Sequence, residues 1–216
     1  MRKEPEMRDK YWLAGHFYEL TTSAAVSRCR VAMLDYLQPG EKCLFAGVGH
    51  GEDAIYAAQR GADVTVVDTS KTMLAKFQQN LDKFHQANGT PLAVTQVQSD
   101  ILEVADYEQY DMLVANFFLN VFYRDTMVKL LAHLARLGKP GAKIVIGDFV
   151  YPDGNLLSRV SQTLFWYGVA TIYWVLAGNA VHPIYNYPEE MESLGLLVLE
   201  KKYFHGYWSV LGQKRI

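Results

Sequence analysis

Three glycines within five residues, Gly47, Gly49 and Gly51, constrain this chain more than any other feature. They follow an apolar run, 42–46, that is typical of a buried strand, and they precede a helical pattern over 51–60. Glycine lets backbone N–H groups approach a ligand closely, and the start of a helix favours an anionic group. The pattern therefore indicates the first half of a nucleotide-binding α/β unit.

A second apolar run, 63–67, completes this unit and ends at Asp68. An acidic side chain at the carboxyl end of this strand suits two hydrogen bonds to a ribose diol. The dinucleotide-binding pattern G-x-G-x-x-G would need a glycine at position 52, where the chain has Glu52. A pyrophosphate beside Glu52 and Asp53 would meet like charge, whereas a ligand with an amino-acid end and a sulfonium centre would not.

Strand and helix patterns keep alternating along the chain. Such alternation predicts a parallel sheet with helices on both faces and right-handed crossovers. The expected fold class is α/β, a Rossmann-like doubly wound sheet of seven strands, mostly parallel, with an antiparallel C-terminal hairpin. The further helices are expected at 24–37, 70–85 and 123–137, the further strands at 92–98, 109–116 and 142–148, and the hairpin strands at 196–204 and 207–215.

With 216 residues, half of them hydrophobic, the chain is long enough for one domain with a sizeable core. We expect a single domain over 1–216. Its parts are an N-terminal helical lid over 1–38, a cofactor-binding core over 39–148, a hydrophobic substrate-covering insertion over 149–195, and the C-terminal hairpin over 196–216.

The insertion contains a long uncharged segment, because no Lys, Arg, Asp or Glu occurs from 160 to 188. Within it, 164–176 is nearly all apolar or aromatic, but Gly178 and Pro183 interrupt it too early for a membrane span. A buried or substrate-covering helix is favoured, and a helix at a membrane interface stays open. The aromatic residues of this segment predict an apolar pocket; they are Phe165, Trp166, Tyr167, Tyr173 and Trp174.

The composition of the chain limits the kinds of partner and the cellular compartment that we expect for it. A net charge of −2 and a pI near 6.3 give no basic surface for nucleic acid. Two cysteines, with Cys43 in a predicted buried strand, indicate a reducing compartment without a disulfide framework. The charged N-terminus does not read as a secretory signal, so a cytoplasmic location is expected, with peripheral membrane contact and a homodimer as open possibilities. No metal site is predicted.

Successive motifs from 34 to 148 resemble the class I S-adenosylmethionine-dependent methyltransferases. In this chain AGVGHG resembles the glycine motif of that family, and VVDTS resembles its acidic motif at the end of strand two. QSDI resembles its adenine segment, ANFFLNVF resembles its strand-four end, and KPGAKIVIGDF resembles its fifth strand with the preceding loop. The small-molecule branch, which includes ubiquinone and menaquinone methyltransferases, looks closest. Its aromatic lead-in is similar to HFYEL, and its late substrate-side segment to VHPIYNYPEEMESLGL. The resemblance implies S-adenosyl-L-methionine as the cofactor.

The resemblance also implies cofactor contacts. Asp68 would bind the ribose, and Asn116 would end strand four beside the sulfonium. The other contacts would be Gly47, Gly49 and Gly51 with the methionine part, Thr69 and Met73 with the adenine face, Asp100 with the adenine amino group, and Ile101 with the ring edge. Asp100 also suits an ordinary turn or helix cap. One position departs from the family, because an acidic residue usually stands two positions before the first glycine and this chain has Phe45.

Methyl transfer from a sulfonium is an in-line displacement, so a site gains mainly from alignment and from excluding water. The expected acceptor is small and hydrophobic, a phenol, quinone or lipid-like molecule methylated on oxygen or carbon. A phenol or enol would benefit from a general base. The candidate bases lie in the aromatic segments expected to cover the site, with His182 ranked ahead of Tyr18, His16 and Tyr185.

Two other functions stay open. The missing carboxylate at Phe45 suggests a non-catalytic S-adenosylmethionine-binding protein. The general fold suggests an NAD-type oxidoreductase, although a fold alone does not fix a function.

Overall fold

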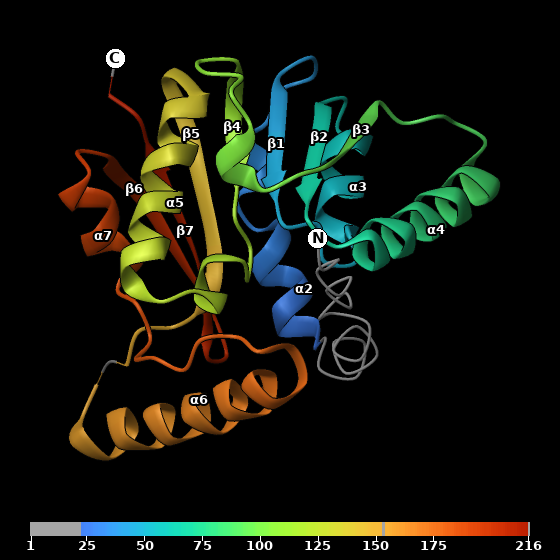
Figure 1. Ribbon diagram of the computed structural model, residues 1–216. Helices are drawn as coiled ribbons and strands as arrows, with labels where there is room; N and C mark the ends of the chain where they lie inside the picture. Colours follow the sequence, from blue (N-terminus) through green and yellow to red (C-terminus); the bar gives the residue numbers. More distant parts are fainter. Residues whose placement is uncertain (1–22, 153, 216) are drawn as a thin grey trace, which may run out of the picture.

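One seven-stranded sheet forms the centre of the computed structural model, which describes residues 23–152 and 154–215 (Figure 1). The strand order is β3-β2-β1-β4-β5-β7-β6. β7 pairs antiparallel with both β5 and β6, and the other pairs are parallel. The predicted fold class is therefore confirmed. The strands are β1 (Lys42–Ala46), β2 (Asp63–Asp68), β3 (Val94–Gln98), β4 (Tyr110–Val114), β5 (Gly138–Phe149), β6 (Leu197–Phe204) and β7 (Tyr207–Gln213).

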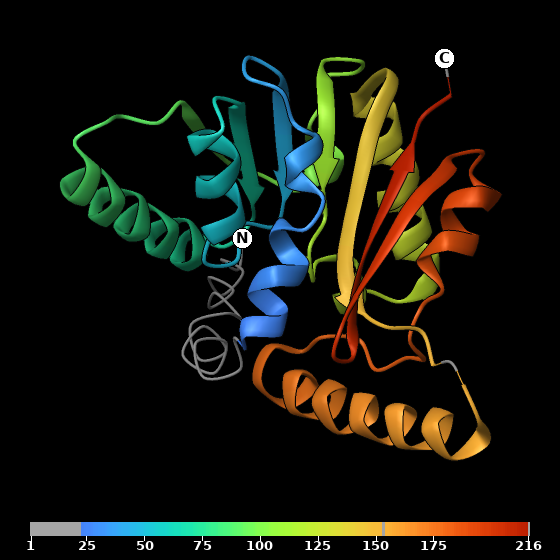
Figure 2. The ribbon, with the colours of Figure 1, turned by 180° about the vertical axis from the view of Figure 1, so that it is seen from behind.

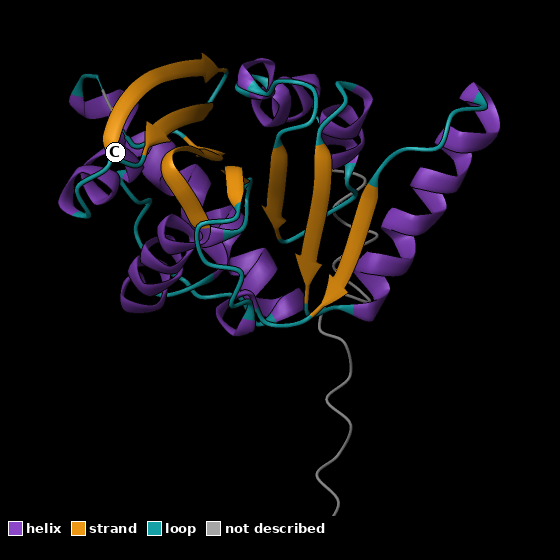
Figure 3. Cartoon of the chain, turned by 90° about the horizontal axis from the view of Figure 1, so that it is seen from above, coloured by secondary structure: helices purple, strands orange, loops and turns teal. Residues whose placement is uncertain are grey.

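Helices cover both faces of the sheet, as the view from above shows (Figure 3). α5 (Arg124–Leu137) and α7 (Tyr187–Ser193) pack on one face. α3 (Glu52–Gln59) and α4 (Lys71–Asn88) pack on the other (Figure 2). The remaining elements are α2 (Ala24–Val31), α6 (Leu156–Ala177), and the short 3-10 helices η1 (Leu34–Tyr36), η2 (Ile101–Glu103) and η3 (Leu119–Val121).

Burial along β1 explains why this strand reads as an uninterrupted apolar run. Leu44 and Ala46 belong to the core under α5, whereas Cys43 and Phe45 belong to the core under α3 and α4. A strand covered by helices on both faces cannot alternate with polar residues. The glycine turn is thus held between two closed layers of core.

The first helix is shorter than predicted. The expected helix over 24–37 ends at Val31, and a 3-10 turn, η1, follows it. The buried positions keep the predicted helical spacing as far as Leu37, whose backbone is already extended. The residue before a proline avoids helical backbone, so Pro39 prevents any helix from continuing through Gln38.

Two further boundaries differ. α4 continues three residues past the expected end and stops at Asn88, where Gly89 caps it with left-handed backbone. β5 begins at Gly138, although the segment before 142 was expected to be a loop. The pairing of β4 with β5 shifts register between Tyr110 and Met112, so Pro140 lies in a bulge where no ladder hydrogen bond is required of it.

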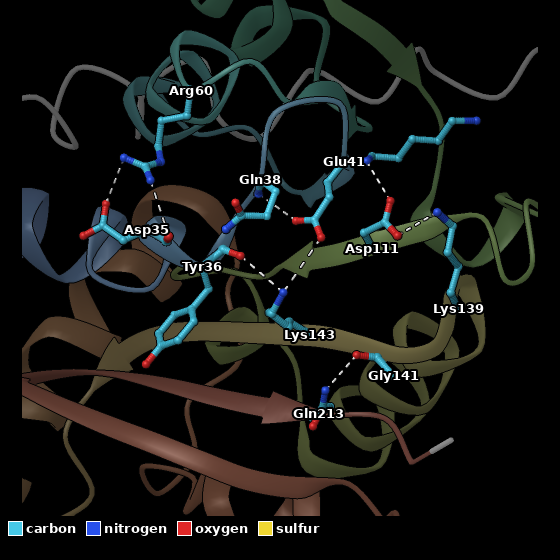
Figure 4. Close-up of polar contacts among 11 residues, drawn as sticks. Asp35, Tyr36, Gln38, Glu41, Arg60, Asp111, Lys139, Gly141, Lys143 and Gln213 are labelled. Atoms are coloured by element: carbon cyan, nitrogen blue, oxygen red, sulfur yellow. Dashed lines mark hydrogen bonds and ion pairs between the residues drawn. The ribbon is translucent and has the colours of Figure 1, made fainter.

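Polar side chains close the sheet at the amino ends of β1, β4 and β5 (Figure 4). Asp111 accepts hydrogen bonds from the Lys139 ammonium at 2.6 Å and from the Lys42 amide at 2.9 Å. Partial burial alone would raise the pKa of Asp111, but these two hydrogen bonds and the positive charges of Lys139 and Lys143 together hold the pKa below its usual value. This network leaves the opposite, carboxyl edge of the sheet as the place for a ligand.

α6 lies across that carboxyl edge, apart from the other helices (Figures 1 and 2). The sequence favours a buried or a substrate-covering helix here, and full burial is not found, because Leu164 and Val175 on the outer side are each 69% exposed. Its inner side is covered, with Trp166 and Ala170 buried. Among the described residues, no helix has the length and apolar character needed to cross a membrane.

Candidate functional site

A cavity of about 620 Å³ opens at the carboxyl edge of the sheet, between the strand ends and α6. Its size falls within the range of small-molecule sites. Because neighbouring strands place their ends side by side, the sheet order sorts the lining. The two carboxylates of the lining, Asp68 and Asp100, lie at or after the ends of β2 and β3, and its aromatic residues come from the segment after β4 and from β5, β7 and α6.

The glycine turn forms one wall of the cavity. Gly47 and Gly49 line it, and both have positive φ, at 74° and 52°. A Cβ atom on Gly47 would lie 2.7 Å from the Phe118 ring. Gly51 has a different use: it is not among the lining residues, and a side chain there would collide with Phe77 of α4. The structure therefore brings two of the three predicted glycines to the cavity, and the third allows α4 to pack.

Asp68 ends β2 at the cavity and ties three segments together. Its Oδ2 accepts a hydrogen bond from the Val48 amide at 2.9 Å, within the glycine turn. Its Oδ1 accepts from the Ser70 amide at 2.8 Å, at the start of α4. Each carboxylate oxygen can accept a second hydrogen bond, so Asp68 is held in a fixed orientation and can still receive a ligand hydroxyl.

The predicted adenine-contacting residues also meet here. Thr69 directly follows Asp68, and Met73 lies in the first turn of α4; both line the cavity together with Asp100 and Ile101, which follow β3. Asp100 accepts a hydrogen bond from the Leu102 amide at 2.9 Å and so caps η2, which was the alternative open from the sequence. Lining the cavity and capping η2 are compatible, because the second carboxylate oxygen is left for another donor.

Asn116 reaches the cavity from the end of β4. Its amide nitrogen donates to the Arg30 carbonyl at 3.0 Å and to Asp53 Oδ2 at 2.8 Å, so both amide hydrogens are used. Its Oδ1 lies against Gly147, where a Cβ atom would be only 2.5 Å away. These contacts lock the Asn116 amide in one orientation.

The other half of the cavity is aromatic. Phe117 has left-handed backbone with φ of 53°, which is uncommon for a bulky residue, and its ring meets those of Phe149 and Tyr207 edge to face. Phe165 and Trp166 of α6 complete this aromatic wall. Of the five aromatic residues predicted to form a pocket, Phe165, Trp166 and Tyr173 line it, and Tyr167 and Trp174 project from other sides of the helix.

The predicted catalytic residues are not gathered in the cavity. His182 and Tyr185 are buried, are not among the lining residues, and stack on each other with ring centroids 4.2 Å apart. Both ring nitrogens of His182 are within hydrogen-bond distance of carbonyl oxygens, those of Pro183 and Asn120. The Tyr185 hydroxyl donates to the Phe122 carbonyl. His16 and Tyr18 lie outside the described residues.

Asp148 is a buried carboxyl group that sequence patterns gave no reason to single out. It is the second-to-last residue of β5 and accepts hydrogen bonds from Tyr187, from the Asn120 side chain and from the Phe149 amide at 2.6, 2.8 and 2.7 Å. Burial raises its pKa to about 7, against the lowering effect of these three donors. Asn120 and Phe149 line the cavity, so Asp148 fixes part of its wall.

These features fit S-adenosylmethionine. The positive-φ glycines leave room for the close approach of its amino-acid end, and Asp68 can accept from a ribose. Phe45 is 2% exposed and packs in the core under α3, so position 45 offers no charge to the site. Among the described residues, no group of three or more His, Cys, Asp or Glu is placed to hold a metal ion.

Comparison with known families gives a match to the segment that contains the glycine turn and the parallel strands. Residues 44–141 match the model of a family described as a methyltransferase domain. Over 123 residues, 56% of this chain, the sequence is 29% identical to the ribosomal protein L11 methyltransferase of Geobacillus thermodenitrificans (strain NG80-2). The aligned part is 36% of the length of that relative.

Solved structures share the fold over nearly the whole chain. The 1,6-didemethyltoxoflavin-N1-methyltransferase of Burkholderia thailandensis, with bound S-adenosylhomocysteine, is 18% identical with a TM-score of 0.69, covering 94% of this chain and 84% of that one. The magnesium protoporphyrin IX methyltransferase of Synechocystis PCC 6803, also with S-adenosylhomocysteine, is 19% identical with a TM-score of 0.62, covering 93% and 84%. The matched segment and these solved structures agree with the Rossmann-like methyltransferase fold that the sequence predicts.

Proposed function

From this methyltransferase domain and the cavity beside it, we propose that the protein transfers a methyl group from S-adenosylmethionine to a small, largely apolar acceptor, a phenol, quinone or lipid-like molecule. One observation carries the proposal. One half of the cavity, beside β2 and β3, holds its two carboxylates, Asp68 and Asp100, and the other half, beside β4, β5, β7 and α6, holds its aromatic residues. A nucleoside suits the polar half, and a hydrophobic acceptor suits the aromatic half.

The residues of the polar half would hold the cofactor. Asp68 would accept from the ribose, Gly47 and Gly49 would border the amino-acid end, and Asp100 and Ile101 would meet the adenine. Each of these groups is fixed by the fold before any ligand arrives, so little order has to be imposed on binding. When bound, S-adenosylmethionine supplies an electrophilic methyl group on a sulfonium.

The aromatic half would align the acceptor and exclude water. Phe117 is fixed by its backbone and by its ring contacts, and Phe149 packs between it and α6. An in-line displacement gains most from such fixed alignment in a dry site. We propose that α6 acts as the substrate cover of the 149–195 insertion, with its inner side facing the acceptor.

The chain's own proton chemistry contributes little in this proposal. In the described part of the lining the ionisable side chains are Asp68 and Asp100, both on the cofactor side, and Tyr173 and Tyr207. Burial raises the pKa of Tyr207, which keeps its hydroxyl protonated, so its phenolate is not available as a base. His182 and Tyr185 would support the wall. An acceptor that needs a general base would receive it from the first 22 residues, in which His16 and Tyr18 stay candidates.

The test is methyl transfer itself. Purified full-length protein is incubated with S-adenosylmethionine labelled in the methyl group and with quinones, phenols and fatty acids in turn. We expect label in at least one apolar acceptor and not in a charged acceptor of similar size. Binding of S-adenosylhomocysteine without transfer to any acceptor would favour the non-catalytic alternative, and binding of NAD alone would favour the oxidoreductase.

The kinship with ubiquinone and menaquinone methyltransferases stays a prediction, and the labelled quinones test it. The exposed outer side of α6 bears on two further predictions, peripheral membrane contact and a homodimer. Vesicle sedimentation and light scattering of the full-length protein distinguish them, because an outer-side variant such as Leu164→Gln would abolish vesicle binding in the first case and reduce the mass in the second.

A further inference from the structure

Phe45 leaves the amino-acid end of the proposed cofactor site without the carboxylate that the resembled family places there. Asp53, eight residues later, provides a carboxylate just after the glycine turn. It lies in the first turn of α3 and is 4% exposed, whereas its neighbour Glu52 is exposed. The chain has therefore buried one of two adjacent acidic residues and left the other in solvent.

An ion pair does not explain why Asp53 is buried. Among residues 23–152 and 154–215, no lysine or arginine pairs with it. Its carboxylate accepts from the Ala54 amide at 3.2 Å and from the Asn116 amide at 2.8 Å. The start of a helix stabilises an anion there by a modest amount, but burying a carboxylate without a cation remains costly.

Asp53 acts on the cavity through one residue. Asn116 donates one amide hydrogen to Asp53 and the other to the Arg30 carbonyl, and Asn116 lines the cavity beside the glycine turn. Without Asp53 the Asn116 amide would lose one of its two fixed partners. The negative charge of Asp53 is also felt in this low-dielectric layer, where a cationic ligand group would be favoured.

We propose that Asp53 replaces the carboxylate missing at Phe45: it is a positioning residue that orients Asn116 and makes the amino-acid end of the site favour an ammonium group. This inference rests on the proposed function, because the ligand ammonium is that of S-adenosylmethionine. It also explains how a chain with Phe45 can keep a complete cofactor site.

Calorimetric titration with two nucleosides tests the role of Asp53. S-adenosylhomocysteine carries the ammonium, whereas 5′-methylthioadenosine keeps the nucleoside and lacks the amino-acid end. We expect Asp53→Asn to weaken S-adenosylhomocysteine by about tenfold or more and to leave methylthioadenosine within about twofold. Glu52→Gln, on the same helical turn but exposed, is the matched control and should change neither affinity.

The outcomes separate the hypotheses. Equal weakening of both nucleosides by Asp53→Asn would show a merely structural role, and unchanged affinity for S-adenosylhomocysteine would show no role, so either overturns the inference. Failure of the unmodified protein to bind either nucleoside would instead overturn the proposed function. If Asp53→Asn does not fold, the unmodified protein is titrated with the analogue of S-adenosylhomocysteine that lacks only the amino group, and equal affinities would overturn the inference.

Discussion

At the scale of single side chains, we propose that cofactor binding depends most on Asp68. It fixes the glycine turn through Val48, fixes the start of α4 through Ser70, and faces the cavity. We expect Asp68→Ala to weaken S-adenosylhomocysteine by about a hundredfold, because hydrogen bonds to a charged group contribute about 1.5–3 kcal/mol each. Calorimetric titration measures the loss.

The control for this variant lies on the same strand. Asp63 begins β2 at the far edge of the sheet and is exposed, so Asp63→Ala should leave the affinity unchanged. A similar loss of affinity in both variants would show that the effect of Asp68→Ala comes from general destabilisation, and the ribose assignment would then fail.

The raised pKa of Asp148 predicts how the stability of the protein depends on pH. Its folded pKa of about 7 lies above the ordinary value of 3.8, so between these values the folded state keeps a proton that the unfolded chain has released. The stability from this proton is full below about pH 4 and is lost as the pH rises through about 7. Asp148→Asn cannot titrate, so its free energy of unfolding should lose this dependence.

Denaturant unfolding of both proteins at several pH values between 5 and 8 measures the effect. The free energy of unfolding of the unmodified protein should fall relative to that of Asp148→Asn, by about 1.4 kcal/mol for each unit of pKa difference traversed. Tyr187→Phe removes one donor that lowers the pKa, so it should move the transition to higher pH. Parallel curves for all three proteins would contradict the assignment.

At the scale of elements, α6 has two sides with different expected roles. Ala170 is buried and lines the cavity, and its neighbour Thr171 is exposed. A leucine at 170 would occupy space in the aromatic half, so Ala170→Leu should raise the KM for an apolar acceptor severalfold while the affinity for S-adenosylhomocysteine stays unchanged. Thr171→Leu is the matched control. Steady-state kinetics with an acceptor from the labelling screen, supported by titration, decides between the two sides.

An unchanged KM in Ala170→Leu, or an equal rise in Thr171→Leu, would show that α6 does not cover the acceptor.

For the molecule as a whole, the sequence predicts the sheet and its order of elements well, because buried parallel strands and glycine turns have strong local signals. Boundaries are harder, since they depend on tertiary contacts. Gly138 and Pro140 read as a loop, but a bulge allows them to join β5. α7 left no clear pattern because it is only seven residues long, and the outer side of α6 reads as apolar although it is exposed.

The sequence likewise predicts one part of the candidate site and misses another. The predicted cofactor residues come together because they follow strand ends, and only Gly51 is turned away from the cavity. The predicted base His182 lies elsewhere, because an aromatic segment does not reveal which of its side chains face inward. Asp53, Asn120 and Asp148 act through hydrogen bonds between segments distant in the sequence, and a single sequence contains no signal of such pairs.

The central claim is that this cavity binds S-adenosylmethionine for methyl transfer. Calorimetric titration of the purified full-length protein with S-adenosylmethionine, S-adenosylhomocysteine and NAD tests it most directly. We expect the protein to bind one equivalent of either sulfur nucleoside, the two to compete with each other, and NAD to give no heat of binding. Saturable binding of NAD with no response to either sulfur nucleoside would contradict it.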